Sequence, residues 1–179
     1  MTDIYINGDD GRSWDFGGVL RIHSAKQVAL AEGQTHLLIE ASCTTHNTSC
    51  HCGKKESRLR LNGCTHKTMA DEPLNNKPVH YRVRLQRYYC LMCKKTFQQS
   101  LQPIMVDAYS GGKITIRLSI WLLKLMLNHD VTRTSIYQQT AQMTGYSRIW
   151  ARKWVQSRVR ESKVIEATQD RKRRPQTSA

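Results

Sequence analysis

Two pairs of closely spaced cysteines constrain the fold of this chain more than any other feature. The first pair is Cys50 and Cys52; the second, Cys90 and Cys93, comes after 37 intervening residues. Two thiolates this close on a tight turn can both reach one metal ion, and two such turns complete a tetrahedral zinc shell. We therefore expect one structural Zn²⁺ held by these four cysteines.

The second pair carries the stronger signal. It closes the strand-like run 81–89 and opens the segment 94–97, which is typical of a knuckle at the end of a β-hairpin. The first pair is Cys-x-Cys, which is tighter than the usual Cys-x-x-Cys. The two remaining cysteines, Cys43 and Cys64, are expected to be small buried residues rather than ligands.

The N-terminus and the hydropathy of the chain favour a reducing environment for these cysteines. Residues 1–5 lack the basic and apolar regions of a signal peptide, and the apolar run 114–127 is interrupted by Arg117 and Lys124. We expect a cytoplasmic location and no membrane partner. In that compartment metal binding explains six thiols better than disulfides do.

Charge is distributed unevenly along the 179 residues, which carry a formal net charge of +14. Counting Lys and Arg against Asp and Glu, the net charge is −3 for residues 1–52, +7 for 53–110 and +10 for 111–179. The basic excess therefore lies on the cysteine-containing segment and on the C-terminal segment after it. Because a basic surface attracts polyanions and releases their counterions, this pattern predicts a nucleic-acid partner.

Composition and periodicity predict an α+β fold with three regions and a tail. The first two predicted parts are a short β-rich N-terminal extension (1–42) and a small zinc-ribbon β-hairpin domain (43–100). A helix-turn-helix domain (101–162) and a basic disordered tail (163–179) follow. Within the extension we expect strands at 19–22 and 36–40, and a short helix at 25–32.

The hairpin of the second region is predicted from the alternation of apolar with polar residues. Residues 58–61 and 79–88 have the period-two pattern of half-buried strands, and the turn-rich stretch 71–78 joins them. Arg82 and Arg84 fall on the outer face of this hairpin, where spaced guanidinium groups suit contact with phosphates. A solvated edge would have the same pattern.

A first helix is predicted over residues 113–128, with its basic residues on one stripe. A second, apolar stripe consists of Ile116, Ile120, Leu123 and Leu127. The alternation at 113–117 would also suit a strand, but the length of the segment favours a helix.

Two further helices, 132–144 and 146–161, meet at Gly145 with the spacing of a helix-turn-helix. Glycine supplies the positive φ of the turn, and Ala151 and Trp154 fall where the second helix packs back on the first. The opposite, outward face carries groups that can reach bases and phosphates in a major groove: Ser147, Arg148, Ile149, Arg152, Lys153 and Gln156. A helical hairpin with a solvated basic face would look the same.

These motifs together resemble the N-terminal DNA-binding heads of bacterial insertion-sequence transposases. The resemblance covers roughly residues 49–160 and is most specific at 87–97, Arg-Tyr-Tyr-Cys-Leu-Met-Cys-Lys-Lys-Thr-Phe. It implies that a zinc finger and a helix-turn-helix bind the terminal repeats of a mobile element. It also implies that Cys52, Cys90 and Cys93 are zinc ligands.

The chain departs from that family in two ways. The family's first cysteine would fall at Ser49, so Cys50 is the natural substitute. Other side chains stay open as the fourth ligand: Cys43, His46, His51 and His66. Such transposases also carry a large nuclease domain whose carboxylates bind two metal ions, whereas only about 20 residues follow the third helix. We therefore expect the recognition module without the catalytic one.

The sequence as a whole predicts a zinc-dependent, non-catalytic protein that reads duplex DNA with the helix after Gly145. It would act as a transposase-like recognition module or a transcriptional regulator on a bacterial nucleoid. Three features of the sequence argue against an enzyme. The histidines are scattered, cysteines fill the zinc shell, and there is no glycine-rich phosphate loop. The alternative is a non-catalytic subunit of a larger nucleoprotein complex that grips RNA, single strands or partner proteins.

Overall fold

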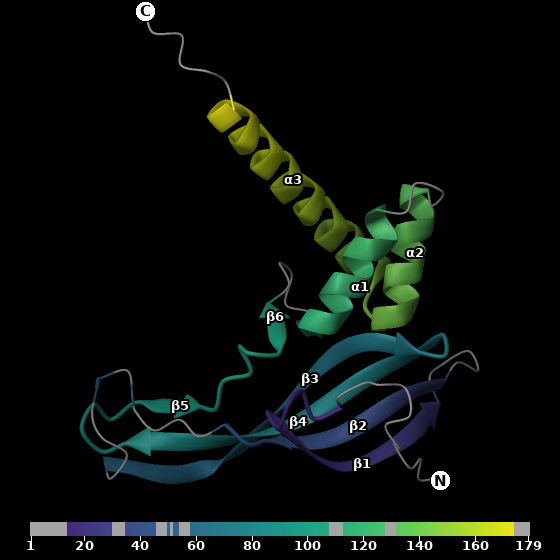
Figure 1. Ribbon diagram of the computed structural model, residues 1–179. Coiled ribbons are helices and arrows are strands. Elements are labelled where there is room, and N and C mark those ends of the chain that lie inside the picture. The colour runs from purple at the N-terminus through teal and green to yellow at the C-terminus, as the bar shows by residue number, and fades with distance from the viewer. Residues whose placement is uncertain are drawn as a thin grey trace, which may run out of the picture.

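In the residues that it describes, the computed structural model of this chain has seven strands and three helices (Figure 1). It describes residues 14–29, 35–45, 50, 52–53, 58–107, 113–127 and 132–173, with only the backbone of 106–107, 133 and 161–173. The strands are β1 (Leu20–Ala29), β2 (Thr35–Cys43), β3 (Leu59–Leu74), β4 (Lys77–Cys90), β5 (Thr96–Gln98), β6 (Met105–Asp107) and β7 (Lys113–Thr115). The helices are α1 (Ile116–Leu127), α2 (Arg133–Thr144) and α3 (Arg148–Arg173). The predicted α+β class is confirmed.

The long β3–β4 hairpin is the centre of a single sheet. The strand order is β1-β2-β4-β3-β7-β6, and β5 pairs with β4. The hairpin turn is narrower than the predicted 71–78: it consists of Asn75 and Asn76, whose φ values of 49° and 60° suit a two-residue turn. Strand β2 pairs in parallel with β4, with Ile39 beside Tyr81. The N-terminal strands are therefore part of the same sheet as the hairpin.

The predicted helix at 25–32 is wrong, because β1 continues through these positions to Ala29. Antiparallel pairing with β2 places Ala25 beside Ile39 and Lys26 beside Leu38. Ala25 is buried, and Lys26 donates to Glu40 at 3.3 Å. Partners on the neighbouring strand thus override the helix preference of the segment. Residues 30–34 lie outside the described part of the chain.

Side chains at alternate positions of β4 face two different environments, as predicted. Tyr81, Val83 and Leu85 are fully buried in a core that is completed by β1, β2 and the segment from Leu101 to Ile104. Arg82 and Arg84 are exposed on the opposite face. Farther along that opposite face the helices cover one end of the sheet and form a second core (Figure 1).

The predicted helix at 113–128 divides into β7 and α1. Ile114 pairs with Ala70 of β3 and is buried, so the alternation at the start of this segment belongs to a strand. Thr115 ends the strand and caps the helix, because its Oγ1 accepts a hydrogen bond of 3.1 Å from the Leu118 amide. On α1 the side chains that enter the core are Leu118 and Leu122.

A buried ion pair joins α1 to the hairpin. Asp71 of β3 is fully buried, and its Oδ2 accepts a hydrogen bond of 2.5 Å from Nη2 of Arg117. Its Oδ1 accepts a bond from the Thr115 hydroxyl. The Arg117 guanidinium also donates to the Tyr81 hydroxyl at 3.2 Å and lies 3.9 Å from the Phe16 ring centre. Burial lowers the pKa of Arg117, but the charge of Asp71 outweighs it and raises that pKa above its ordinary value.

The boundaries of α2 match the predicted helix at 132–144. Thr132 caps it by accepting a 3.3 Å bond from the Ser135 amide, and Gly145 ends it with a φ of 65°. Helix α3 extends farther than predicted, through part of the segment predicted as a disordered tail, since no proline or glycine interrupts it before Pro175. Across the described ranges, none of the helices combines the length and the apolar character needed to cross a membrane.

Replacing the buried carboxylate should be far more destabilising than replacing an exposed one. We expect Asp71→Ala to lower the free energy of unfolding by about 3–5 kcal/mol, because it leaves the Arg117 guanidinium without its counter-ion. The matched control is Glu40→Ala, which removes the partly exposed pair with Lys26 and should change it by less than about 1 kcal/mol. Urea unfolding at pH 7 measures the free energy of unfolding of both variants. Equal losses of stability would contradict the role of Asp71 as the buried counter-ion of Arg117.

Candidate functional site

Four cysteine sulfurs from two distant segments meet at one end of the sheet. The Sγ atoms of Cys50, Cys52, Cys90 and Cys93 all lie within 4.8 Å of one another. The closest pairs are Cys50 with Cys93 at 3.4 Å and Cys52 with Cys90 at 3.7 Å. Sulfurs bound tetrahedrally to zinc lie about 3.8 Å apart, given a Zn–S distance of about 2.3 Å. These four residues can therefore hold one metal ion, and none of them is in a disulfide.

Tight backbone turns present the two cysteine pairs. Cys90 is the last residue of β4, and its carbonyl accepts a 2.9 Å bond from the Lys94 amide. Lys94 has a φ of 57° and returns the chain so that the Lys95 carbonyl accepts a bond from the Cys90 amide. In the first pair, the Gly53 amide donates to the Cys50 carbonyl at 2.9 Å, and the φ of Gly53 is 71°. Both turns follow from short local bonds, as the spacing predicts.

The four thiols cannot all ionise without a compensating cation. Hydrogen bonding from the Cys93 amide lowers the pKa of Cys90 to about 7. The Cys52 amide favours the Cys50 thiolate, but burial and the neighbouring sulfurs outweigh it and raise the pKa of Cys50 to about 12. A divalent cation would offset the repulsion between thiolates at such short distances.

Those of the remaining candidate ligands that lie in the described part of the chain are not part of this cluster. Cys43 is buried, as predicted, and contacts the Thr45 hydroxyl at 2.9 Å. Cys64 was expected to be buried, but it is exposed beside a β-bulge of β3. His66 is exposed on β3 and pairs with Arg84 of β4. Two further candidates, His46 and His51, lie outside the described residues.

A second candidate site lies at the junction of α2 and α3. Gly145, Tyr146 and Ser147 join the two helices, and Ser147 caps α3 by accepting a 3.2 Å bond from the Trp150 amide. Ala151 and Trp154 are buried in the helical core, as predicted. Thr144, the last residue of α2, is fully buried and donates a hydrogen bond from its hydroxyl to the Thr140 carbonyl.

A histidine from the sheet holds this junction in place. His80 of β4 lies 2.8 Å through its Nε2 from the Thr144 carbonyl at the end of α2. A side chain at Gly145 would come within 3.3 Å of the His80 ring, so the turn lies directly on the sheet. Burial lowers the pKa of His80 more strongly than the Thr144 carbonyl raises it. The ring of His36 lies 5.0 Å away in an edge-on arrangement.

The first turns of α3 present a basic surface. The predicted residues that are exposed are Ser147, Arg148, Ile149, Arg152 and Lys153. The sequence from Gly145 to Arg160 contains no acidic residue. This surface therefore combines a hydroxyl and three cations without a competing carboxylate of its own.

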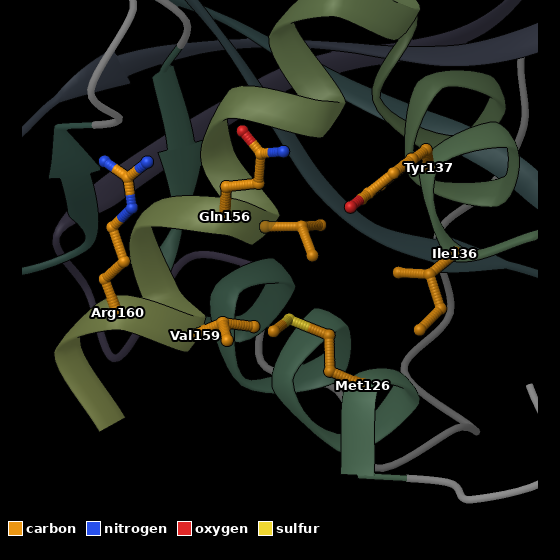
Figure 2. Close-up of a pocket in the computed structure, with 7 residues that line it drawn as sticks. Met126, Ile136, Tyr137, Gln156, Val159 and Arg160 are labelled. Atoms are coloured by element: carbon orange, nitrogen blue, oxygen red, sulfur yellow. The ribbon is translucent and has the colours of Figure 1, made fainter. Parts of the chain in front are cut away.

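Gln156 occupies a different environment from the rest of the predicted outward face. It is half-buried and lines a cavity of about 390 Å³ between the three helices. Figure 2 shows Tyr137 and Ile136 on one side of this cavity and Arg160 on the side away from Tyr137. The amide is thus set back from the exposed cations of α3.

Arg82 and Arg84 are exposed on the same face of β4 as His80. One Nη atom of Arg82 lies 3.9 Å from a carboxylate oxygen of Glu40, so its charge is partly compensated. Because alternate residues of a strand share a face, the two arginines extend from the histidine under the helix junction toward the cysteine cluster.

Comparisons with protein-family models, curated proteins and solved structures found no match for this chain.

His80 is a site residue that the sequence pattern did not single out. It falls on the predicted outer face of a strand, where a polar side chain is ordinary. Its partner, the Thr144 carbonyl, is 64 residues away, so no local spacing indicates the contact. The one signal in the sequence was that His80 precedes Arg82 by two residues and so shares its face of the strand.

The cysteine cluster predicts about one zinc ion per chain. Cys90→Ser should lose the metal and destabilise the sheet end, because three remaining ligands no longer fill the tetrahedral shell. Cys64→Ser is the matched control: it removes an exposed thiol outside the cluster and should retain the metal. Elemental analysis and chelator titration followed by circular dichroism measure both. A chain that stays fully folded without metal would contradict a structural role.

The partly buried side chain of His80 leads us to expect that stability falls in mild acid. The pKa of His80 is lowered in the folded chain, so the unfolded chain takes up the proton first as the pH falls below about 6.5. The free energy of unfolding should therefore be steady above pH 7 and decrease between about pH 6.5 and 5. His80→Gln, whose amide can still donate to the Thr144 carbonyl, should reduce this decrease. His66→Gln, at an exposed histidine, should leave it unchanged.

Proposed function

We propose that this chain is a zinc-stabilised DNA-binding protein that reads duplex DNA with the N-terminal half of α3. The observation that carries the proposal is the exposed set of Arg148, Arg152 and Lys153 on a helix whose other face is buried. Guanidinium and ammonium groups hydrogen-bond to guanine edges and to phosphates, and an α-helix fits the width of a major groove.

The junction with α2 supports a helix-turn-helix interpretation. A three-residue turn that begins with a positive-φ glycine follows α2, and Trp154 packs α3 back on the helical core. The turn rests on His80, so the sheet would act as a rigid platform for the reading helix. A platform of this kind keeps exposed side chains at fixed positions, which sequence-specific reading requires.

Zinc would have a structural role in this function. Cys50, Cys52, Cys90 and Cys93 would hold one Zn²⁺, which cross-links the segment before β3 to the end of β4. Four protein ligands leave no open coordination position, so the site does not suit activation of a water molecule. The metal would fix the C-terminal end of β4, the strand that carries Arg82 and Arg84 farther along.

The resemblance to transposase DNA-binding heads agrees with this proposal. It suggests a mobile-element recognition module or a transcriptional regulator. The net charge of +14 favours the same class of partner, since neutralising phosphates releases counterions.

Removing the exposed cations of α3 should weaken both affinity and sequence discrimination. After selection of a preferred site from a random duplex pool, we expect Arg152→Ala and Lys153→Ala each to weaken binding to it about 5- to 100-fold. Binding to random duplex should weaken less. Fluorescence anisotropy at several salt concentrations measures affinity and discrimination together.

Lys77→Ala is the matched control for these variants, because it removes an exposed cation at the β3–β4 turn, outside α3. It should change affinity for selected and random duplexes by the same small factor. Unchanged discrimination in the α3 variants, or failure of the pool to enrich any site, would contradict reading by α3.

A second candidate function is favoured by apolar side chains at the cysteine end. Leu61, Leu91 and Met92 are exposed there, beside the stacked rings of Tyr88 and Phe97. Such a surface suits unstacked bases or a protein partner in a nucleoprotein complex. Tighter binding to single strands than to any selected duplex would favour this function.

A further inference from the structure

An apolar stripe on α1 faces solvent instead of the core. It consists of Ile116, Ile120, Leu123 and Leu127, with exposed fractions of 40%, 48%, 38% and 74%. The core side of the same helix is supplied by Leu118 and Leu122. A helix that is apolar on two faces has one more face than this fold buries.

The spacing of the stripe is that of a helix-pairing seam. Its residues follow one another at intervals of four, three and four positions, which is the a/d pattern of a heptad. The pattern is also self-complementary. When two α1 helices pack antiparallel about a two-fold axis, Ile116 meets Leu127 of the second copy and Ile120 meets its Leu123.

The charges beside the stripe are compatible with a second copy. The flanking cations of α1 are Arg117 and Lys124. Arg117 is already neutralised by Asp71 at 2.5 Å. Lys124 would therefore approach an ion pair of the second copy rather than an unpaired cation. The four residues of the seam itself carry no charge.

The size of the seam predicts a weak dimer. Helix α1 has 12 residues and is about 18 Å long, so pairing through it alone falls at the low end of specific interfaces. Such an interface dissociates in the micromolar range unless a second contact supports it.

We propose that the exposed face of α1 is the interface of a homodimer in which two α1 helices pack antiparallel. This interface uses side chains that neither the cysteine cluster nor the basic face of α3 employs. It would exist whether or not the chain binds DNA.

Sedimentation equilibrium of the full zinc-loaded chain from about 1 to 200 μM tests the dimer. The mass should rise from 20.7 kDa toward twice that value as concentration increases. Ile120→Lys and Leu123→Glu should each shift the dissociation constant upward at least tenfold, and circular dichroism checks their folding. Ile149→Glu, at an exposed apolar position of α3 outside the stripe, should leave the mass unchanged.

A charge-rescue experiment tests the antiparallel arrangement. An equimolar mixture of the Ile120→Lys chain with the Leu123→Glu chain should form a heterodimer, because these two positions face each other across the two-fold axis. A monomeric wild-type chain at every concentration would overturn the proposal. So would single variants that dimerise like the wild type, or a mixture that fails to recover the dimer.

Discussion

The carboxylate of Asp71 is the contact on which the arrangement of sheet and helices depends. It lies fully buried between β3 and α1, where it binds Arg117 and the hydroxyl that caps α1. Through Arg117 it also reaches Tyr81 of the central strand and Phe16 near the N-terminus. A buried charge is tolerated only with its partners in place, so this network selects one packing of the helices on the sheet.

The two candidate sites lie at opposite ends of that framework. The cysteine cluster closes the far end of the β3–β4 hairpin, and the α2–α3 junction rests on His80 nearer its turn. Strand β4 connects them, with Arg82 and Arg84 exposed between. A metal ion bound there would therefore act at a distance from α3, by fixing the strand on which the α2–α3 junction rests.

Local signals in the sequence predicted the parts of the fold that local chemistry determines. Alternation located β4 and its buried face, Gly145 marked the end of α2, and the cysteine spacing anticipated a four-sulfur cluster. Contacts between distant segments explain what was missed. Pairing with β2 converted the predicted helix at 25–32 into a strand, and packing on Ala70 turned a different side of α1 toward the core.

The parallel pairing of β2 with β4 has a consequence for how the chain is made. Residue 37 pairs with residue 79, so β2 cannot complete its hydrogen bonds until β4 has been synthesised. During translation at about 5–20 residues per second, the β1–β2 hairpin must wait for seconds with Ile39 uncovered. Strands β3 and β4 are neighbours in the chain and can pair with each other directly, after which β4 offers the edge on which β2 pairs. Strand β4, which is synthesised after β3, therefore completes the pairing of the β1–β2 hairpin.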